Sequence, residues 1–185
     1  MRRIGLLFAL LTVAGLRAGA QESISVGDVL VPEGRQAMME VMFHFSEGHD
    51  YVSYQFTVNL PEGISLVTNA NGKVPVTLGD GQDEDIYTLD LNATSRIVTC
   101  YSNPSTPIGG TDGVLVRIPV EADAEVVSAG DVLEGTLTDV EFTHNEGAVR
   151  TPFASVSFSV GVTGQVILDE SYTWVPYATD AACDL

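Results

Sequence analysis

The chain has 185 residues, of which 8 are basic and 25 acidic, giving a formal net charge of −17 at pH 7. A surface this acidic repels phosphate backbones and anionic membranes, and so few cations cannot build a basic patch for nucleic acid. We therefore expect no nucleic-acid partner. Solubility, cation binding and attraction to a basic partner all remain compatible with the charge.

Residues 1–20 have the features of a secretory signal peptide. Arg2 and Arg3 precede an apolar run at residues 4–16, and the small residues 18–20 follow shortly after it. The run is shorter than the ~20 residues that span a bilayer, so we expect cleavage after Ala20 and no membrane insertion afterwards. Cleavage would remove three of the eight basic residues and no acidic one, which lowers the net charge to −20. The sequence thus predicts export to the cell surface or the extracellular space, with the periplasm also open.

Apolar and polar side chains alternate with a period of two through most of the remaining chain, a pattern typical of β-strands. The clearest case is residues 52–60, where apolar side chains on one face alternate with Ser53, Gln55, Thr57 and Asn59 on the other. One face is expected to be buried and one exposed. Further strands are predicted at residues 23–31, 37–45, 64–68, 74–78, 86–91, 96–101, 114–120, 133–143, 154–162 and 165–168.

Short turn sequences rich in Gly, Pro, Asn and Asp separate these segments, and no stretch has a convincing helical period. Residues 121–129 are either one short helical turn or a polar loop. The pattern indicates an all-β protein of about nine strands, packed as a two-sheet antiparallel sandwich of jelly-roll type. We expect this domain to span residues 21–163, followed at residues 164–185 by a short strand and a linker-like tail.

Several segments resemble the cohesin-like and carbohydrate-binding-module type of β-sandwich found in secreted bacterial surface proteins of the Bacteroidetes type. The most telling is YQFTVNLPEGI, an aromatic strand that runs into Leu-Pro-Glu-Gly. The resemblance covers roughly residues 23–170 and implies a module that holds a protein or a glycan, or a spacer beside a catalytic domain. The other segments that carry it are residues 24–29, 31–34, 113–115, 129–131 and the tail VILDESYTWVP.

Motifs for catalysis are missing from the sequence. It contains no G-x-S-x-G elbow, and His44, His49 and His144 have neither a nucleophile at motif spacing nor the spacing of zinc ligands. With 25 acidic residues, some pair of carboxylates will lie close together by chance, so such a pair does not predict a glycoside hydrolase. We therefore predict no catalytic residues, with a hydrolase as the alternative, and treat His44, on the exposed face of its strand, as an ordinary surface side chain.

One acidic loop is a candidate cation site. Asp80, Asp83, Glu84 and Asp85 fall within six residues, and calcium prefers several carboxylate and carbonyl oxygens. The loop lacks the spacing of an EF-hand, and in an exposed loop the repulsion between these acids is screened by salt. A solvated loop is therefore the alternative. No other cofactor is expected.

The polar strip Ser53, Gln55, Thr57 and Asn59 is the weak candidate for a ligand-binding surface, and the simpler interpretation is that it is only the solvent-exposed side of a sheet. Exposed aromatic side chains beside it would favour a glycan, and Tyr51, Tyr87, Tyr101, Tyr172 and Trp174 are the candidates. We expect a non-catalytic binding module that contacts a glycan or a partner protein, with a structural spacer as the alternative. The oligomeric state and a disulfide between Cys100 and Cys183 are left open.

Overall fold

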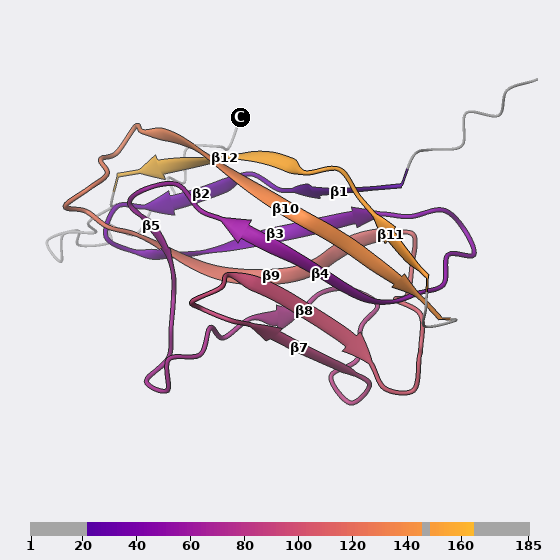
Figure 1. Cartoon of the computed structure of the whole chain (residues 1–185). Coiled ribbons are helices and arrows are strands. Elements are labelled where there is room, and N and C mark those ends of the chain that lie inside the picture. The colour runs from indigo at the N-terminus through magenta and orange to yellow at the C-terminus, as the bar shows by residue number, and fades with distance from the viewer. Residues whose placement is uncertain (1–21, 146–148, 165–185) are drawn as a thin grey trace, which may run out of the picture.

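The computed structural model describes residues 22–145 and 149–164, which form two β-sheets packed face to face (Figure 1). These residues form twelve strands and contain no helix that is long and apolar enough to cross a membrane. The five-stranded sheet has the order β1-β3-β9-β5, with β6 also paired to β9. Its strands are β1 (Ser23–Val26), β3 (Gln36–His44), β5 (Ile64–Leu66), β6 (Thr77–Leu78) and β9 (Asp112–Ala122).

The seven-stranded sheet has the order β2-β12-β10-β4-β8-β7, and β11 pairs with the C-terminal part of β10. Its neighbouring strands are antiparallel, except that β2 and β12 run parallel. The predicted all-β, two-sheet sandwich of jelly-roll type is confirmed. The strands of this sheet are β2 (Val29–Pro32), β4 (Tyr51–Asn59), β7 (Tyr87–Leu91), β8 (Ile97–Ser102), β10 (Val132–His144), β11 (Arg150–Pro152) and β12 (Val156–Thr163).

The strand predicted at residues 23–31 is in fact two strands that belong to different sheets. β1 pairs antiparallel with β3, whereas β2 pairs parallel with β12. The last hydrogen bond to β3 is donated by the Gly27 amide to the Glu40 carbonyl at 3.0 Å. The chain passes to the other sheet at Gly27 and Asp28. β11 was not predicted at all, and the strand predicted at residues 154–162 begins only at Val156, with Ala154 exposed before it. The strand count is therefore above the predicted nine.

Three other predictions concern residues 121–129, the N-terminal segment and residues 165–168. Residues 121–129, left open between a helical turn and a loop, form the end of β9 followed by a turn, in which the Val126 and Val127 amides both donate to the Asp123 carbonyl at 3.0 Å. The predicted signal peptide and the predicted strand at residues 165–168 lie outside the described residues.

The core lies between the two sheets and is centred on β4. Val52, Tyr54, Phe56 and Val58 are buried, and the intervening polar side chains are only partly covered, as the alternation predicts. Tyr54, Phe56 and Val58 belong to one core cluster that contains residues of both sheets. Among the partners in this core are Met39, Val41, Ile118, Val120, Leu137, Phe142 and Val160.

The predicted alternation at residues 114–120 fails at one point because β9 contains a β-bulge. Val41 pairs with Val116 and the next residue, Met42, pairs with Val114, so Leu115 is an extra residue in β9. Leu115 and Val116 are both fully buried, while Val114 is only partly buried. All three side chains are apolar, and this uniformity hides the bulge from a reading of the sequence.

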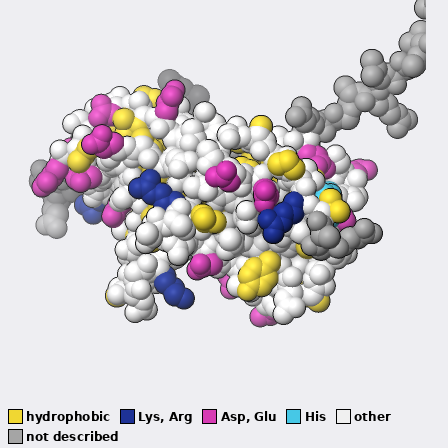
Figure 2. All heavy atoms as spheres, in the orientation of Figure 1, with side chains coloured by type: hydrophobic (Ala, Val, Ile, Leu, Met, Phe, Trp, Pro, Cys, Tyr) yellow, Lys and Arg dark blue, Asp and Glu magenta, His cyan; other side chains and the backbone are white. Residues whose placement is uncertain are grey.

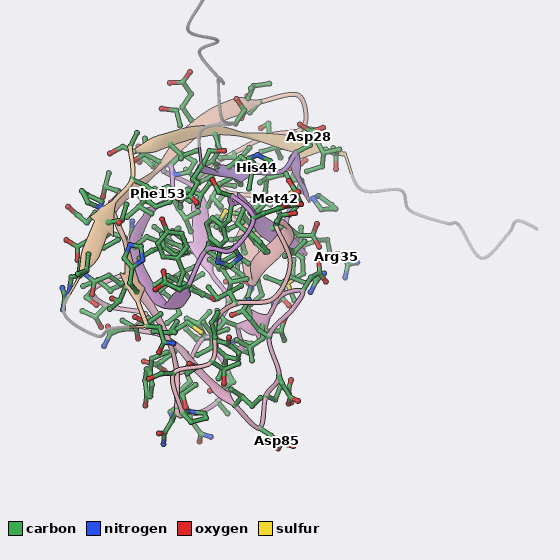
Figure 3. The ribbon with its side chains drawn as sticks, turned by 90° about the vertical axis from the view of Figure 1, so that its right-hand side faces the viewer. Asp28, Arg35, Met42, His44, Asp85 and Phe153 are labelled. Carbon is green, nitrogen blue, oxygen red and sulfur yellow. The ribbon has the colours of Figure 1, made fainter. Side chains whose placement is uncertain are left out.

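Aromatic rings fill one end of the sandwich, the end seen in Figure 3. The Phe142 ring centroid lies 4.8 Å from that of Phe153, 5.1 Å from Phe45 and 5.2 Å from Tyr51. Phe45 follows β3, Tyr51 begins β4, Phe142 belongs to β10 and Phe153 follows β11, so the cluster joins residues 45–51 to residues 142–153, which are far apart in the sequence.

We expect Phe142→Ala to lower the free energy of unfolding by about 3 to 5 kcal/mol, because it opens a cavity in a well-packed cluster. The Phe142 side chain is 0% exposed. Urea denaturation of the variant measures the loss. Met38→Ala is the control, because Met38 is 50% exposed on β3 and should change stability by less than about 1 kcal/mol. Equal losses in the two variants would contradict this account of the core.

Candidate functional site

The four predicted ligand-binding residues, Ser53, Gln55, Thr57 and Asn59, lie side by side on the outward face of β4. β4 pairs with β10 on one side and β8 on the other, so this strip is the middle of a broader surface. We call it the β4 face. Its flanking outward side chains are Thr136, Thr138, Glu141 and Thr143 from β10, and Ile97, Thr99 and Tyr101 from β8.

Lateral hydrogen bonds tie the side chains of the β4 face to one another. Gln55 Nε2 donates to Glu141 Oε2 at 3.2 Å, and Thr57 Oγ1 donates to Asp139 Oδ2 at 3.3 Å. Asn59 Nδ2 lies 3.3 Å from Thr136 Oγ1 and 3.2 Å from Thr138 Oγ1. Such cross-strand bonds limit the rotamers of the outward side chains.

Asp139 reaches the β4 face because of a register shift in β10 that could not be predicted from the sequence. The pairing of β10 with β4 shifts between Thr138 and Glu141, and Asp139 has a positive φ of 54°. Asp is among the few residues other than Gly that tolerate this conformation. The shift turns the Asp139 carboxylate toward Thr57 and keeps Val140 buried.

A shallow hollow of about 200 Å³ indents the β4 face near its end. Tyr101 stands on one side of it and is 53% exposed. On the other side, Arg150 Nη1 donates to Glu141 Oε2 at 3.1 Å. The surrounding surface in Figure 2 is mostly uncharged, with isolated charged and apolar side chains. Sequence reasoning gave Arg150 no role, since its place beside Glu141 depends on the turn between β10 and β11.

Two of the aromatic candidates are not exposed. Tyr51 and Tyr87 are buried, and the Tyr87 hydroxyl donates to the Thr106 carbonyl at 2.6 Å. Burial, followed by the nearby Cys100, raises the pKa of Tyr87 to about 12. Tyr172 and Trp174 lie outside the described residues. Of the three candidates that are described, Tyr101 alone is exposed.

The candidate calcium residues lie in one loop but serve different local contacts. Asp80 Oδ2 accepts the Val114 amide at 3.0 Å, and Asp83 Oδ1 accepts the Asp85 amide at 2.9 Å. Asp85 lies at the outer tip of the loop in Figure 3. Across residues 22–145 and 149–164, no three His, Cys, Asp or Glu side chains form a group that could hold a metal ion. Calcium binding by Asp80, Asp83, Glu84 and Asp85 stays a prediction.

Gln82 fixes this loop by inserting its amide between the sheets. Its Nε2 donates to the Leu115 carbonyl at 2.7 Å, and its Oε1 accepts the Tyr54 hydroxyl at 3.3 Å and the Cys100 thiol at 3.5 Å. Burial raises the pKa of Cys100 to about 11, so this thiol stays protonated at neutral pH. Cys100 is free in the structure, while Cys183 lies outside the described residues.

All three histidines gather at the aromatic end of the sandwich. His44 Nδ1 lies 2.5 Å from Asp112 Oδ1, and His144 Nδ1 lies 2.5 Å from Asp50 Oδ1. A ring nitrogen of His49 lies 2.8 Å from the Gly110 carbonyl. The interpretation of His44 as an ordinary surface histidine missed its pair with Asp112, and sequence reasoning did not find the His144–Asp50 pair, because the partners are 68 and 94 positions apart in the sequence.

Asp50, His144 and Thr151 form a chain that has the order of a hydrolase triad. His144 Nε2 lies 2.8 Å from Thr151 Oγ1, on the opposite side of the ring from Asp50. In many hydrolases the amide after the nucleophile stabilises the oxyanion, but here that residue is Pro152, which has no N–H. These hydrogen bonds connect Asp50, His144 and Thr151, but the group lacks the backbone amide that would stabilise an oxyanion.

The pairing also changes the acidity of the carboxyl groups. The hydrogen bond from His144 lowers the pKa of Asp50, and that from His44 lowers the pKa of Asp112. For Glu22, burial raises the pKa, but hydrogen bonds from the Tyr51 hydroxyl and the Ser46 amide outweigh it, and the pKa falls below its ordinary value. All three acids thus favour the charged form in the folded protein.

Comparison with known proteins identifies the fold. No protein-family model matches the chain, and no curated protein matches it in sequence. Among solved structures, a type I cohesin of Pseudobacteroides cellulosolvens is similar with a TM-score of 0.58 and 14% identity, over 82% of this chain and 98% of that one. A non-cellulosomal cohesin of Archaeoglobus fulgidus is similar with a TM-score of 0.57 and 14% identity, over 78% of this chain and 92% of that one.

A third similar structure is the cohesin of a type I cohesin–dockerin complex from Clostridium thermocellum, with a TM-score of 0.56 and 13% identity over 76% of this chain and 94% of that one. At these identities the similarity is one of fold. The chain has a cohesin-like β-sandwich fold, as the sequence resemblance implied, whereas the Bacteroidetes-type origin stays a prediction.

The lowered carboxyl pKa values predict how stability depends on pH. The folded protein binds fewer protons than the unfolded chain near pH 4, so the free energy of unfolding should rise with pH through this range and fall in acid. The ordinary pKa of Asp50 is 3.8, and its folded value is lower. Stabilisation from the His144 pair is therefore present above about pH 4 and is lost as the pH falls further.

Asp50→Asn should flatten the acid part of this profile, with a change of up to about 1 kcal/mol for a pair near the surface. Urea denaturation between about pH 3 and pH 6 measures it. Asp85→Asn is the matched control, because Asp85 is exposed at the tip of another loop. A profile that is the same in Asp50→Asn and in the wild-type protein would contradict a role for the Asp50–His144 pair.

Proposed function

We propose that the chain is a non-catalytic protein-binding module that docks a partner protein module on the β4 face. Two things support the proposal. The fold is cohesin-like, and one of the similar cohesins was solved in complex with a dockerin. The observation that carries it is the β4 face itself, a polar surface held by lateral hydrogen bonds, with Tyr101 exposed beside a hollow.

The side chains around the hollow are those that contribute most to protein interfaces. Tyr and Arg are enriched among the residues that dominate binding energy, and a Tyr ring gives a large contact area for two rotatable bonds. Tyr101 is joined on β8 by Ile97, which is 39% exposed. Arg150 lies across the hollow and is held by Glu141. A partner side chain entering here would meet an aromatic ring and an ion pair.

A glycan is a weaker candidate for the same surface. Glycan recognition generally uses several exposed aromatic rings, and Tyr51 and Tyr87 are buried. An enzyme is weaker still, because the hollow on the β4 face is shallow and the triad-like chain at the aromatic end lacks the amide that Pro152 replaces. A spacer without a partner is the remaining alternative to a protein-binding module.

The module would act outside the cytoplasm, given the signal peptide expected at residues 1–20. After cleavage its charge would be −20, since three basic residues and no acidic ones are removed. A protein of this charge attracts basic partners at long range and repels acidic ones. Association should therefore weaken as salt is added, because screening shortens the reach of these charges to about 8 to 10 Å.

Tyr101→Ala should weaken binding of the partner about five- to thirtyfold, which corresponds to the loss of about 1 to 2 kcal/mol for an interface tyrosine. The chain without residues 1–20 is immobilised, partners are captured from surface extracts of the source organism, and the captured protein is purified and titrated. Met38→Ala is the control, because the Met38 residue is 50% exposed, close to the 53% of Tyr101, but lies on the other sheet and should leave binding unchanged.

If the partner binds Tyr101→Ala as tightly as it binds the wild-type protein, the interface does not lie on the β4 face around Tyr101, and the proposal is wrong. The same immobilised chain is also tested on a glycan array, with and without calcium. If the wild-type protein retains a glycan and Tyr101→Ala does not, the ligand of the β4 face is a carbohydrate and not a protein. Failure to bind any protein or glycan would favour the spacer.

A further inference from the structure

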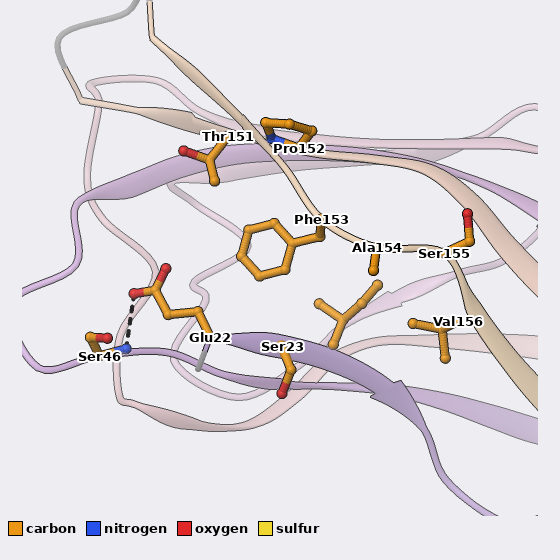
Figure 4. Close-up of a pocket in the computed structure, with 10 residues that line it drawn as sticks. Glu22, Ser23, Ser46, Thr151, Pro152, Phe153, Ala154, Ser155 and Val156 are labelled. Carbon is orange, nitrogen blue, oxygen red and sulfur yellow. Dashed lines mark hydrogen bonds between the residues drawn. The ribbon is translucent and has the colours of Figure 1, made fainter. Parts of the chain in front are cut away.

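A groove of about 630 Å³ opens on the side of the sandwich, between β1 and the segment at residues 151–156 (Figure 4). It is lined by residues 22–24, Ser46 and residues 151–156. None of these residues belongs to the β4 face, so the groove is a separate surface. It lies where the sheets are not closed, because β1 belongs to one sheet and the segment at residues 151–156 to the other.

Both rims of the groove carry backbone groups without strand partners. Among the described residues, β1 is the edge of its sheet and pairs with β3 alone. Because Gly27 donates to Glu40, the antiparallel alternation turns the amide and carbonyl of Ile24 away from β3, toward the open side. On the other rim, no backbone hydrogen bond within the described residues engages Ala154 or Ser155.

The space between the rims has an apolar base. Ile24 is buried, and the Phe153 ring points into the gap between the two segments in Figure 4, where it also contacts the Phe142 ring at 4.8 Å. Val156 adds a partly buried side chain, while Ser23 and Ser155 lie at the rims. Free backbone groups along the rims of an apolar trough are what an added β-strand requires.

Glu22 supplies the charge at one end of the groove. One of its carboxylate oxygens accepts the Ser46 amide at 3.0 Å and the other accepts the Tyr51 hydroxyl at 2.5 Å. These bonds fix the carboxylate in place and leave it further lone pairs. The described lining contains no Lys, Arg or His, and His49, which also interacts with the Glu22 carboxylate, lies outside this lining. A positive side chain of an occupant would therefore meet an anion within the groove itself.

We infer that the groove binds an extended peptide segment that adds to the open edge of β1 and places a Lys or Arg side chain at Glu22. The segment would pair with the Ile24 backbone and cover Phe153 and Val156 with its inward side chains. The binding energy would come from main-chain hydrogen bonds, with specificity from the alternating pockets and from Glu22. This site is independent of the proposed docking on the β4 face.

The test is a titration of the ¹⁵N-labelled chain, without residues 1–20, with a short peptide of alternating Thr and Val that contains one Lys. Amide resonances of Ile24, Ala154 and Ser155 should shift in a saturable way. A peptide with Glu in place of Lys should bind roughly two- to tenfold more weakly, because it exchanges attraction for repulsion at a surface carboxylate. A peptide that is N-methylated at the alternate residues whose N–H groups would point toward β1 should not bind, because it lacks the donors for main-chain pairing.

Ser155→Trp and Ser157→Trp form a matched pair, since both serines are exposed but only Ser155 lines the groove. Ser155→Trp should abolish the shifts and Ser157→Trp should keep them. Loss of binding in both variants, binding that survives in Ser155→Trp, or no shift with the Lys peptide overturns the inference. Tyr101→Ala should bind the peptide normally, so a failure of the β4 face proposal does not affect this result.

Discussion

The burial of one face of β4 between two sheets is the constraint on which the rest of the structure depends. From Val52 onward the buried side chains are Val52, Tyr54, Phe56 and Val58, and along this part of the strand every second residue must then face outward. The polar strip on the β4 face is therefore a product of the same periodicity that makes the core. A one-residue slip of β4 would bury Gln55 and Thr57 and expose Tyr54 and Phe56, so the register is strongly specified.

How much of this could be read from the sequence depends on whether the signal is local. The alternation at residues 52–60 is local, and it correctly placed Ser53, Gln55, Thr57 and Asn59 on one outward face. The positions of Asp139 and Arg150 depend on a register shift and on a turn, and neither leaves a trace in composition. The His44–Asp112 and His144–Asp50 pairs join distant segments, so only the strand order brings them together.

The split of the first strand shows the same limit and has a larger consequence. Residues 23–31 read as one alternating segment, yet the pairing changes from β3 to β12 at Gly27. Because β1 stays with one sheet and β2 crosses to the other, β2 connects the two sheets, and within the part of the chain that the structure describes the sandwich is open beside β1. Sequence reasoning placed these residues in strands but could not show that one edge would be left free.

An open edge next to an apolar trough is normally a hazard, since it can pair with another copy of the chain. Three features limit that hazard here. β1 has only four residues, Pro152 on the opposite rim has no amide to donate, and Glu22 places a fixed negative charge at the end of the edge. Two copies meeting at this edge would bring like charges together, and the rest of the acidic surface adds to the repulsion. The same charge attracts a segment that carries a Lys or Arg, so the features that oppose self-association also select a basic, extended occupant.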